Sequence, residues 1–388
     1  MAAVLLDHKF VLYDSSCTIP RAPRTFPWRQ LREISKSRDD KKVNSMRARQ
    51  LAVVEPYKVE LREVEIADPA PNQVLVAAEC SGVSAGTELA VYTGTHQWLR
   101  DPNMPDWKFP FRPGYSAAGR ILKVGSEIKG WKEGDRVSFP GNHASAELLT
   151  QGHERFRFWK LPEGLSAEKA SLGCIARYGF GASVRAGLTL GRSAAVLGLG
   201  IIGQFAARCM VAAGCYPVVG IDSVPMRRKA ALASGVHHAI DPGAGDTGQQ
   251  LREFLGARGA EVVADATGIP DAVPVAMSLA CDAGQVIVVG SPRGKAQNVN
   301  FYDDLHRRYI EVSGAHGNML FEPGHVRLAG AWSIDKAQNW LLGALASGRL
   351  NLEGLVTHNL APSQLGEAYE GLLKDKDNWL GVIIHWDR

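Results

Sequence analysis

The 388-residue sequence lacks the features of a membrane protein or of a disulfide-stabilised one. Its longest apolar stretches, such as 194–203, are too short to cross a bilayer. The first residues include Asp7 and Lys9 and do not have the basic and then apolar pattern of a secretory signal, so we expect no such leader. The six cysteines form no C-x-x-C pair, which argues against a cysteine-rich zinc lobe and favours the reducing cytoplasm.

The body of the chain also lacks an excess of charge of either sign. The sequence holds 44 Lys and Arg and 40 Asp and Glu, of which residues 1–45 contain nine and five, so the rest contains 35 of each. We therefore expect no nucleic-acid partner for that rest. Residues 1–45 are polar and Arg-rich without a sustained period, which predicts a flexible N-terminal extension. An organelle transit peptide and an arm that packs on a partner subunit are the alternatives.

A glycine-rich turn near the middle of the chain carries the strongest functional signal. The apolar run 194–197 is followed by G-x-G-x-x-G and then by an apolar segment of helical length. In a dinucleotide-binding fold the three glycines allow the tight turn, the approach of the pyrophosphate and the packing of helix on strand, and the helix N-terminus attracts the phosphates. We expect cofactor contacts from Gly198, Leu199, Gly200, Ile201, Ile202 and Gly203.

An acidic residue follows at the distance that this fingerprint requires. Asp222 lies 19 residues after Gly203, at the end of a second β-rich run, where a carboxylate can hold both hydroxyls of the adenosine ribose. A 2′-phosphate would meet this negative charge, so the sequence predicts NAD as cofactor. Arg227 keeps a cation nearby and leaves NADP as the second choice.

Strand and helix patterns alternate after this turn, which predicts an α/β protein with a doubly wound parallel sheet of the Rossmann type. Residues 46–175 instead contain short strand patterns broken by Pro and Gly, as is typical of a mostly antiparallel β domain. No strand–helix repeat is left in 319–388, so this tail is expected to rejoin that domain. The predicted Rossmann domain spans 176–318.

Small residues end the successive strand patterns of the Rossmann part. Strand ends of such a sheet face the dinucleotide, and small residues let the backbone approach it closely. We expect further cofactor contacts from Thr267, Gly268, Gly290, Ser291, Gly314, Ala315 and His316.

Several motifs together resemble the medium-chain dehydrogenase/reductase superfamily over residues 46–388. They include SGVSAGTE at 81–88, RPGY at 112–115, VLGLGIIG at 196–203 and SGAHG at 313–317. The resemblance implies a GroES-like catalytic domain, a Rossmann domain and oxidoreductase activity with a nicotinamide cofactor. It also implies a homodimer or homotetramer. The first two motifs look like a zinc-free branch that includes bacteriochlorophyllide a dehydrogenase.

The same resemblance implies that a catalytic zinc has been lost. Members with zinc carry G-H-E at 114–116, where this chain has G-Y-S, and their first cysteine ligand falls at Ser84 or Ala85. Only Cys174 stands at a ligand position, and one thiol does not hold Zn²⁺, which needs three protein ligands and an open position. Residues 139–160 hold none of the cysteines of a structural zinc lobe. We therefore expect no metal.

Without a metal, a side chain must stabilise the reacting oxygen beside the nicotinamide. Thr87 matches the hydroxyl that relays the alcohol proton in zinc-containing members, and Tyr115 stands at the former histidine position and could donate a hydrogen bond. Glu88 could act as a base or orient a neighbour, and His143 titrates near neutral pH. Each candidate has a structural alternative: a turn threonine, a buried aromatic ring, a salt bridge and a β-edge histidine.

The segment 92–115 is long and aromatic, and it either packs as a small core of its own or forms a wall of the substrate pocket. We take Trp98 and Trp107 as candidate substrate contacts. Arg177 and Tyr178 join them because they occupy the stretch that lies beside the nicotinamide in members of the superfamily.

The predicted function is a zinc-independent cytoplasmic oxidoreductase that transfers a hydride between NAD(H) and a secondary alcohol or ketone. The expected partner is a small-molecule substrate such as a polyol, a sugar or a ring-bearing compound, with no membrane partner. One alternative is a reductase of the C=C bond of an enone or quinone that uses NAD(P)H. Another is a lyase or epimerase that uses tightly bound NAD for transient oxidation.

Overall fold

The computed structural model of the protein describes residues 45–187, 189–317 and 332–387. The predicted N-terminal extension lies outside the described residues up to position 44. Two large sheets organise the described chain, one parallel and one mostly antiparallel. This arrangement confirms the predicted combination of a Rossmann sheet with a GroES-like β fold.

The second half of the chain forms the parallel sheet. Its strands are β8 (Ala194–Leu197), β9 (Val218–Ile221), β10 (His238–Ile240), β11 (Ala260–Asp265), β12 (Ala280–Val288) and β13 (Glu311–Gly314). They lie in the order β10-β9-β8-β11-β12-β13. The chain thus runs outward from β8 to β10 and then returns to β11, so the direction of winding reverses between β8 and β11. Dinucleotides bind outside the carboxyl ends of the strands at such a switch point.

Helices cover both faces of this sheet. They are α3 (Gly173–Ala186), α4 (Ile201–Ala212), α5 (Pro225–Ala233), α6 (Thr247–Leu255) and α7 (Ala272–Leu279), with a π-helix η3 (Phe301–His306) before β13. Ala194 and Val196 of β8 share a hydrophobic cluster with residues of α3 and α4, whereas Ala195 lies in a cluster with residues of α6 and α7. Because both faces are buried, the strand is apolar throughout.

Local signals in the sequence set the ends of these helices. The side chain of Asp246 accepts a hydrogen bond from the backbone N–H of Gln249 at 2.8 Å and caps the start of α6. Gly256 ends the same helix with φ of +61°, a conformation that glycine adopts at little cost. Pro225 begins α5, where its missing N–H costs nothing.

None of the described helices combines the length and apolarity of a membrane span.

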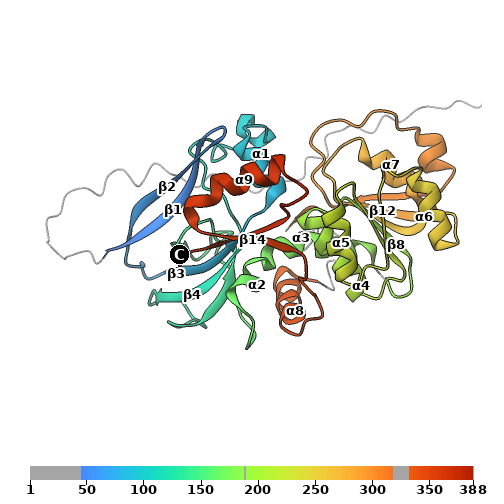
Figure 1. Cartoon of the computed structure of the whole chain (residues 1–388). Helices are drawn as coiled ribbons and strands as arrows, with labels where there is room; N and C mark the ends of the chain where they lie inside the picture. The colour runs from blue at the N-terminus through green and yellow to red at the C-terminus, as the bar shows by residue number, and fades with distance from the viewer. Residues whose placement is uncertain (1–44, 188, 318–331, 388) are drawn as a thin grey trace, which may run out of the picture. The chain divides into compact units, whose positions relative to one another are not determined.

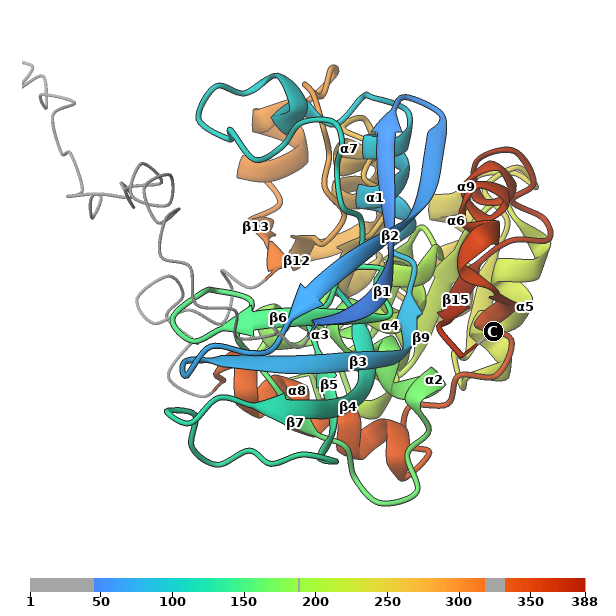
Figure 2. The same ribbon diagram turned by 90° about the vertical axis from the view of Figure 1, so that its left-hand side faces the viewer.

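The first part of the chain forms an antiparallel hairpin and a second large sheet. The hairpin pairs β1 (Ser45–Glu55) with β2 (Lys58–Ala67). The sheet contains β3 (Gln73–Gly82), β4 (Ala117–Val124), β5 (Arg136–Phe139), β6 (Ala146–Thr150), β7 (Trp159–Lys160), β14 (Val356–Leu360) and β15 (Gly381–His385). Its order is β14-β15-β3-β4-β5-β7, with β6 also paired to β3. Figure 2 shows β3, β4 and β5 side by side.

The C-terminal part of the chain returns to this second sheet. β15 pairs antiparallel with β3, with His385 opposite Cys80, and Figure 1 shows the red C-terminal elements beside the blue and teal ones. The remaining helices are α1 (Ala85–Tyr92), α2 (Ala167–Ser171), α8 (Ile334–Ala346) and α9 (Leu365–Lys374), with short 3₁₀ helices η2 (Gln97–Arg100) and η5 (Pro362–Gln364).

Helix α3 runs across the predicted domain boundary at 175/176, and the boundary at 318/319 lies outside the described residues. Both boundaries stay predictions.

Candidate active site

The three glycines of the turn between β8 and α4 have three different environments. Gly198 has φ of +85°, so a side chain there would be strained. A Cβ on Gly203 would lie 1.8 Å from the carbonyl oxygen of Gly198, so only glycine lets α4 pack this close to the turn. A Cβ on Gly200 would meet nothing within 4 Å, which leaves the start of α4 open to a ligand. This is the geometry that the phosphates of a dinucleotide require.

Asp222 lies directly after β9 and holds the same turn in place. One carboxylate oxygen accepts a hydrogen bond from the backbone N–H of Leu199 at 2.7 Å, and the other accepts one from Val224 at 2.8 Å. The guanidinium of Arg227 lies 3.6 Å away. A carboxylate offers about four acceptor positions, so both oxygens can still accept from ribose hydroxyls. That Asp222 binds the ribose hydroxyls stays a prediction. Its hydrogen bonds to Leu199 and Val224 give it a second role, because they hold the turn in place.

The other predicted cofactor contacts fall into two groups. Leu199 and Ile201 are buried in the turn and the first turn of α4, and Thr267 donates a hydrogen bond to Asp265 at 2.7 Å beside Gly198. These residues, with Ile202 and Gly268, do not line the main cavity. The strand ends that do line it are Gly290, Ser291, Gly314, Ala315 and His316.

This cavity has a volume of about 540 Å³, within the range of small-molecule sites. It lies between residues of the two sheets, because its walls include the ends of β12 and β13 together with α1 and the segment before β4. All the predicted substrate residues line it, namely Trp98, Trp107, Arg177 and Tyr178. Of the four predicted catalytic residues, Thr87, Glu88 and Tyr115 line it.

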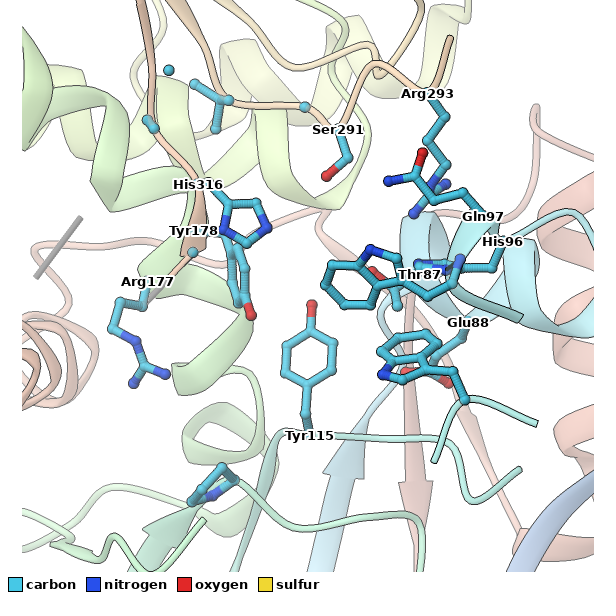
Figure 3. Close-up of a pocket in the computed structure, with 18 of the residues that line it drawn as sticks. Thr87, Glu88, His96, Gln97, Tyr115, Arg177, Tyr178, Ser291, Arg293 and His316 are labelled. Atoms are coloured by element: carbon cyan, nitrogen blue, oxygen red, sulfur yellow. Dashed lines mark hydrogen bonds between the residues drawn. The ribbon is translucent and has the colours of Figure 1, made fainter. Parts of the chain in front are cut away.

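The phenol of Tyr115 lies at the centre of the cavity. Its hydroxyl is 2.5 Å from the hydroxyl of Ser84, which begins α1, and its ring is 5.5 Å from that of Tyr178 on α3. Figure 3 shows both phenols pointing their oxygens into the same space, with Thr87 to one side and Ser291 across from them. Burial, together with the neighbouring Tyr178, raises the pKa of Tyr115 well above its usual value. Tyr115 is therefore a neutral hydrogen-bond donor.

His143 lies behind this site and not in it. Its side chain is fully buried, with Nε2 2.9 Å from a carboxylate oxygen of Glu88 and Nδ1 2.8 Å from the hydroxyl of Ser81. Glu88 also accepts hydrogen bonds from the backbone N–H of Ser84 and from the hydroxyl of Tyr369, at 2.8 and 2.6 Å. An ionised carboxylate is an acceptor only, so Nε2 of His143 carries a proton. We interpret His143 and Glu88 as positioning residues that fix the start of α1.

The aromatic segment 92–115 packs on itself and also forms a wall. The rings of Trp98 and Trp107 meet edge to face at 4.7 Å, and Trp107 stacks on His96 at 4.4 Å. Phe111 adds a further contact to Trp107 at 4.9 Å. Because His96 is buried and Arg293 lies nearby, its pKa falls to about 4. The segment therefore packs on itself and lines the cavity, and the role of that cavity as a substrate pocket stays a prediction.

Two family models match the chain. "Alcohol dehydrogenase GroES-like domain" matches residues 70–217, and "Zinc-binding dehydrogenase" matches residues 202–329. The 2-desacetyl-2-hydroxyethyl bacteriochlorophyllide A dehydrogenase of Cereibacter sphaeroides is 26% identical over 359 residues, which cover 88% of this chain and 99% of that protein. The chain belongs to the medium-chain dehydrogenase/reductase superfamily. It is an oxidoreductase of that superfamily.

One further relative and one solved structure were compared with the chain. The L-threonine 3-dehydrogenase of Thermococcus kodakarensis is 24% identical, over 78% of this chain and 87% of that protein. The solved structure described as a short chain alcohol dehydrogenase from Escherichia coli CFT073, complexed with NADH, superimposes with a TM-score of 0.73 at 16% identity. That match covers 88% of this chain and 99% of the other and shows the shared fold.

The name of one matched family implies zinc, and the residues at the ligand positions do not fit a zinc ion. Tyr115 and Ser84 face each other as two hydroxyls, and Cys174 is fully buried, which raises the pKa of its thiol. Zinc ligands in proteins are thiolates, imidazoles and carboxylates, normally three or four together. In residues 45–187, 189–317 and 332–387, no group of three or more His, Cys, Asp or Glu side chains is arranged for a metal ion.

Several cavity residues were missed at the sequence level. Arg155 and Arg157 come from the segment between β6 and β7, and Arg293 comes from the segment after β12. The alternation of arginine and phenylalanine at 155–158 was a usable signal, since it falls where a structural zinc lobe would otherwise lie. Ser84 was considered only as a former ligand position, although its hydroxyl contacts Tyr115.

Proposed function

We propose that this protein transfers a hydride between NAD(H) and a secondary alcohol or its ketone without zinc. The observation that carries the proposal is the phenol of Tyr115, which lines the cavity onto which the ends of β12 and β13 open, with its hydroxyl 2.5 Å from that of the buried Ser84. Relatives named as dehydrogenases support the reaction type, since the two described above are named for hydroxyl-bearing compounds or threonine.

The reaction needs one group for the hydride and another for the proton. Bound NAD supplies the hydride acceptor. In alcohol oxidation the C–H bond breaks with its electron pair and the O–H bond loses a proton, which passes to the hydroxyl pair and then to solvent. In the reverse direction the carbonyl oxygen gains negative charge as the hydride arrives, and Tyr115 donates its hydrogen bond to that oxygen.

Burial suits Tyr115 to this role. A raised pKa keeps the phenol protonated across the physiological range, so it acts as a donor and not as a phenolate base. The Ser84 hydroxyl can accept from or donate to the phenol, which makes it the next member of a relay. Thr87 lines the same cavity within α1 and can extend that relay toward solvent.

The choice of NAD rests on Asp222. Its carboxylate is 8% exposed and lies between the turn and Arg227, so a 2′-phosphate placed there would face a negative charge. Arg227 partly offsets this repulsion. We therefore propose a preference for NAD over NADP, with homodimeric or homotetrameric assembly and a cytoplasmic location as further predictions.

The proposal is tested by binding and then by turnover. Calorimetric titration of the full chain with NADH and NADPH should give tighter binding of NADH. A panel of secondary alcohols with NAD, and of ketones with NADH, should then change the nicotinamide absorbance. Failure of both cofactors to bind contradicts the proposal. A strong preference for NADPH with turnover of enones supports the C=C reductase instead, and turnover of substrate with co-purified NAD and no net change in absorbance supports a lyase or epimerase.

A further inference from the structure

The main cavity holds more positive charge than the rest of the molecule. Four arginines line it, Arg155, Arg157, Arg177 and Arg293, together with the acidic residues Glu88 and Glu154. The chain after residue 45 has 35 basic and 35 acidic residues, so this excess is local. The carboxylate of Glu88 already accepts hydrogen bonds from His143 and Tyr369 and contributes little toward the arginines.

Arg155 is held in a fixed orientation by buried neighbours. Its Nη1 donates to the side-chain oxygen of Asn142. The side-chain nitrogen of Asn142 donates to Glu147 at 2.6 Å, and its backbone N–H donates to the same carboxylate at 2.8 Å. Asn142 and Glu147 are 5% and 9% exposed. Because its nitrogen is held by Glu147, the amide of Asn142 must present its oxygen to Arg155. The hydrogen bond to Asn142 thus fixes the position of the Arg155 guanidinium.

The charge of the two neighbouring arginines is not neutralised by the described chain. Across the three described ranges, neither Arg155 nor Arg157 takes part in an ion pair, and the only hydrogen bond of their guanidinium groups is the one to Asn142. Both residues are half-buried. Guanidinium groups without an ionic partner are well suited to a carboxylate or a phosphate, which they can hold through paired N–H groups.

The position of these arginines favours the substrate over the cofactor. They come from the segment between β6 and β7 of the antiparallel sheet, whereas the phosphates of a dinucleotide belong at Gly200 and the start of α4, which does not line the cavity. Arg155 and Tyr115 line the same cavity. An anion on Arg155 would therefore share the cavity with the reacting oxygen.

Another part of the cavity wall is aromatic. Trp98, Trp107 and Phe111 line it, and Figure 3 shows Arg293 beside His96 and Gln97 at this side. Apolar surface and guanidinium groups in one cavity suit a ligand with an apolar or ring-shaped part and one anionic group.

We propose that Arg155 and Arg157 bind a carboxylate or phosphate group of the substrate and so select an anionic, hydroxyl-bearing compound. The proposal rests on the proposed function for the identity of the cavity as a substrate site. The binding of an anionic group by these two arginines, however, can be tested by titration alone and does not require turnover.

The test uses matched probes that differ in charge. The full chain saturated with NADH is titrated by calorimetry with benzoate, phenyl phosphate and neutral benzamide. We expect at least one anion to bind tenfold or more tighter than benzamide, with an affinity that falls as salt is raised. Arg155→Gln/Arg157→Gln should lower the anion affinity by roughly ten- to a hundredfold, the usual value of charged hydrogen bonds, and leave benzamide unchanged.

Arg258→Gln is the matched control, because its side chain is 90% exposed on another part of the fold, and it should change none of these affinities. Equal binding of anions and benzamide by the unmodified protein overturns the proposal, whether or not the double variant folds. Equal anion affinity in a folded double variant does so as well. If NADH does not bind, the proposed function fails, and the same titrations without NADH still decide the arginine site.

Discussion

At the scale of single residues, the candidate active site carries hydroxyl groups at positions where zinc-containing members have ligands. Tyr115 stands where the resemblance puts a histidine, the first cysteine position falls at Ser84 or Ala85, and the oxygens of Tyr115 and Ser84 are 2.5 Å apart. In the proposed zinc-free mechanism, two hydroxyls can pass a proton along and donate a hydrogen bond to an oxyanion. The sequence identified Tyr115, and only the structure paired it with Ser84.

Replacing Tyr115 with phenylalanine tests the donor. Tyr115→Phe removes one hydroxyl and keeps the ring, so kcat should fall by about 10²- to 10³-fold, the usual cost of a lost oxyanion donor. The Kd for NADH should stay unchanged by titration. Tyr302→Phe is the control, since Tyr302 is 61% exposed on η3. Retention of full activity by Tyr115→Phe contradicts the assignment.

Gly203 offers a second test, because its role is steric. The Cβ of Gly203→Ala would lie 1.8 Å from the carbonyl oxygen of Gly198, so the turn must move and NADH binding should weaken by at least tenfold or be lost. Gly343 on α8 is the matched control. A Cβ there meets nothing within 4 Å, and Gly343→Ala should stabilise the protein by up to about 1 kcal/mol in denaturant unfolding. Unchanged NADH affinity in Gly203→Ala contradicts this reading of the turn.

At the scale of elements, two segments outside the Rossmann sheet shape the site. The start of α1 is fixed by Glu88, which binds the backbone of Ser84 and contacts His143 and Tyr369. The aromatic segment 92–115 supplies another part of the cavity wall through Trp98, Trp107 and His96.

Glu88→Gln tests the buried network behind α1. The carboxylate accepts three hydrogen bonds, from Ser84, His143 and Tyr369. The side-chain amide of glutamine has only one oxygen, so its NH₂ group would face one of these donors and that hydrogen bond would be lost. The free energy of unfolding should fall by about 1–3 kcal/mol, the cost of an unsatisfied buried polar group. Glu63→Gln on the exposed side of β2 should change it little. Equal losses of unfolding free energy in the two variants would show that the network around Glu88 does not stabilise the protein.

His96 predicts a pH dependence of the aromatic segment. Its pKa is about 4 in the folded protein because of burial and Arg293, against an ordinary 6.5 in the unfolded chain. The unfolded chain therefore binds up to about one more proton in this window, and stability is lost as pH falls from about 6.5 toward 4. His96→Asn should flatten this part of the melting-temperature curve. His306→Asn, at an exposed position on η3, should leave the curve of the unmodified protein unchanged.

At the scale of the whole molecule, the cavity is completed by residues from both sheets. The parallel sheet contributes strand ends, and the antiparallel sheet with its flanking segments contributes Tyr115, Arg155 and Arg157. The return of β15 to β3 ties the C-terminal residues to the same sheet.

Metal analysis tests the zinc-free proposal on the intact protein. Purified enzyme should contain far less than one zinc per chain by elemental analysis, and a chelator such as phenanthroline should leave NADH binding and turnover unchanged. A zinc-dependent alcohol dehydrogenase treated in parallel should lose activity. Stoichiometric zinc, with activity lost on chelation, contradicts the proposal.

The geometry of the glycine turn could be predicted well from the sequence because its signals are local, whereas the cofactor contacts stay predictions. The spacing of Gly198, Gly200 and Gly203 within a strand–turn–helix unit already implies the close approaches that the structure contains. The catalytic side could be predicted only in part. His143 has the right chemistry near neutral pH, yet partners far away in the sequence, Glu88 and Ser81, hold it behind the cavity.

Residue types at short spacing were enough to predict the fold class, the position of the dinucleotide turn and the poor fit of the expected zinc positions. The folded chain was needed to show which hydroxyl meets Tyr115 and that Arg155 and Arg157 share its cavity. Both facts depend on side chains from α1, the segment before β4 and the segment after β6. These elements meet only when the antiparallel sheet forms, and no local pattern encodes that meeting.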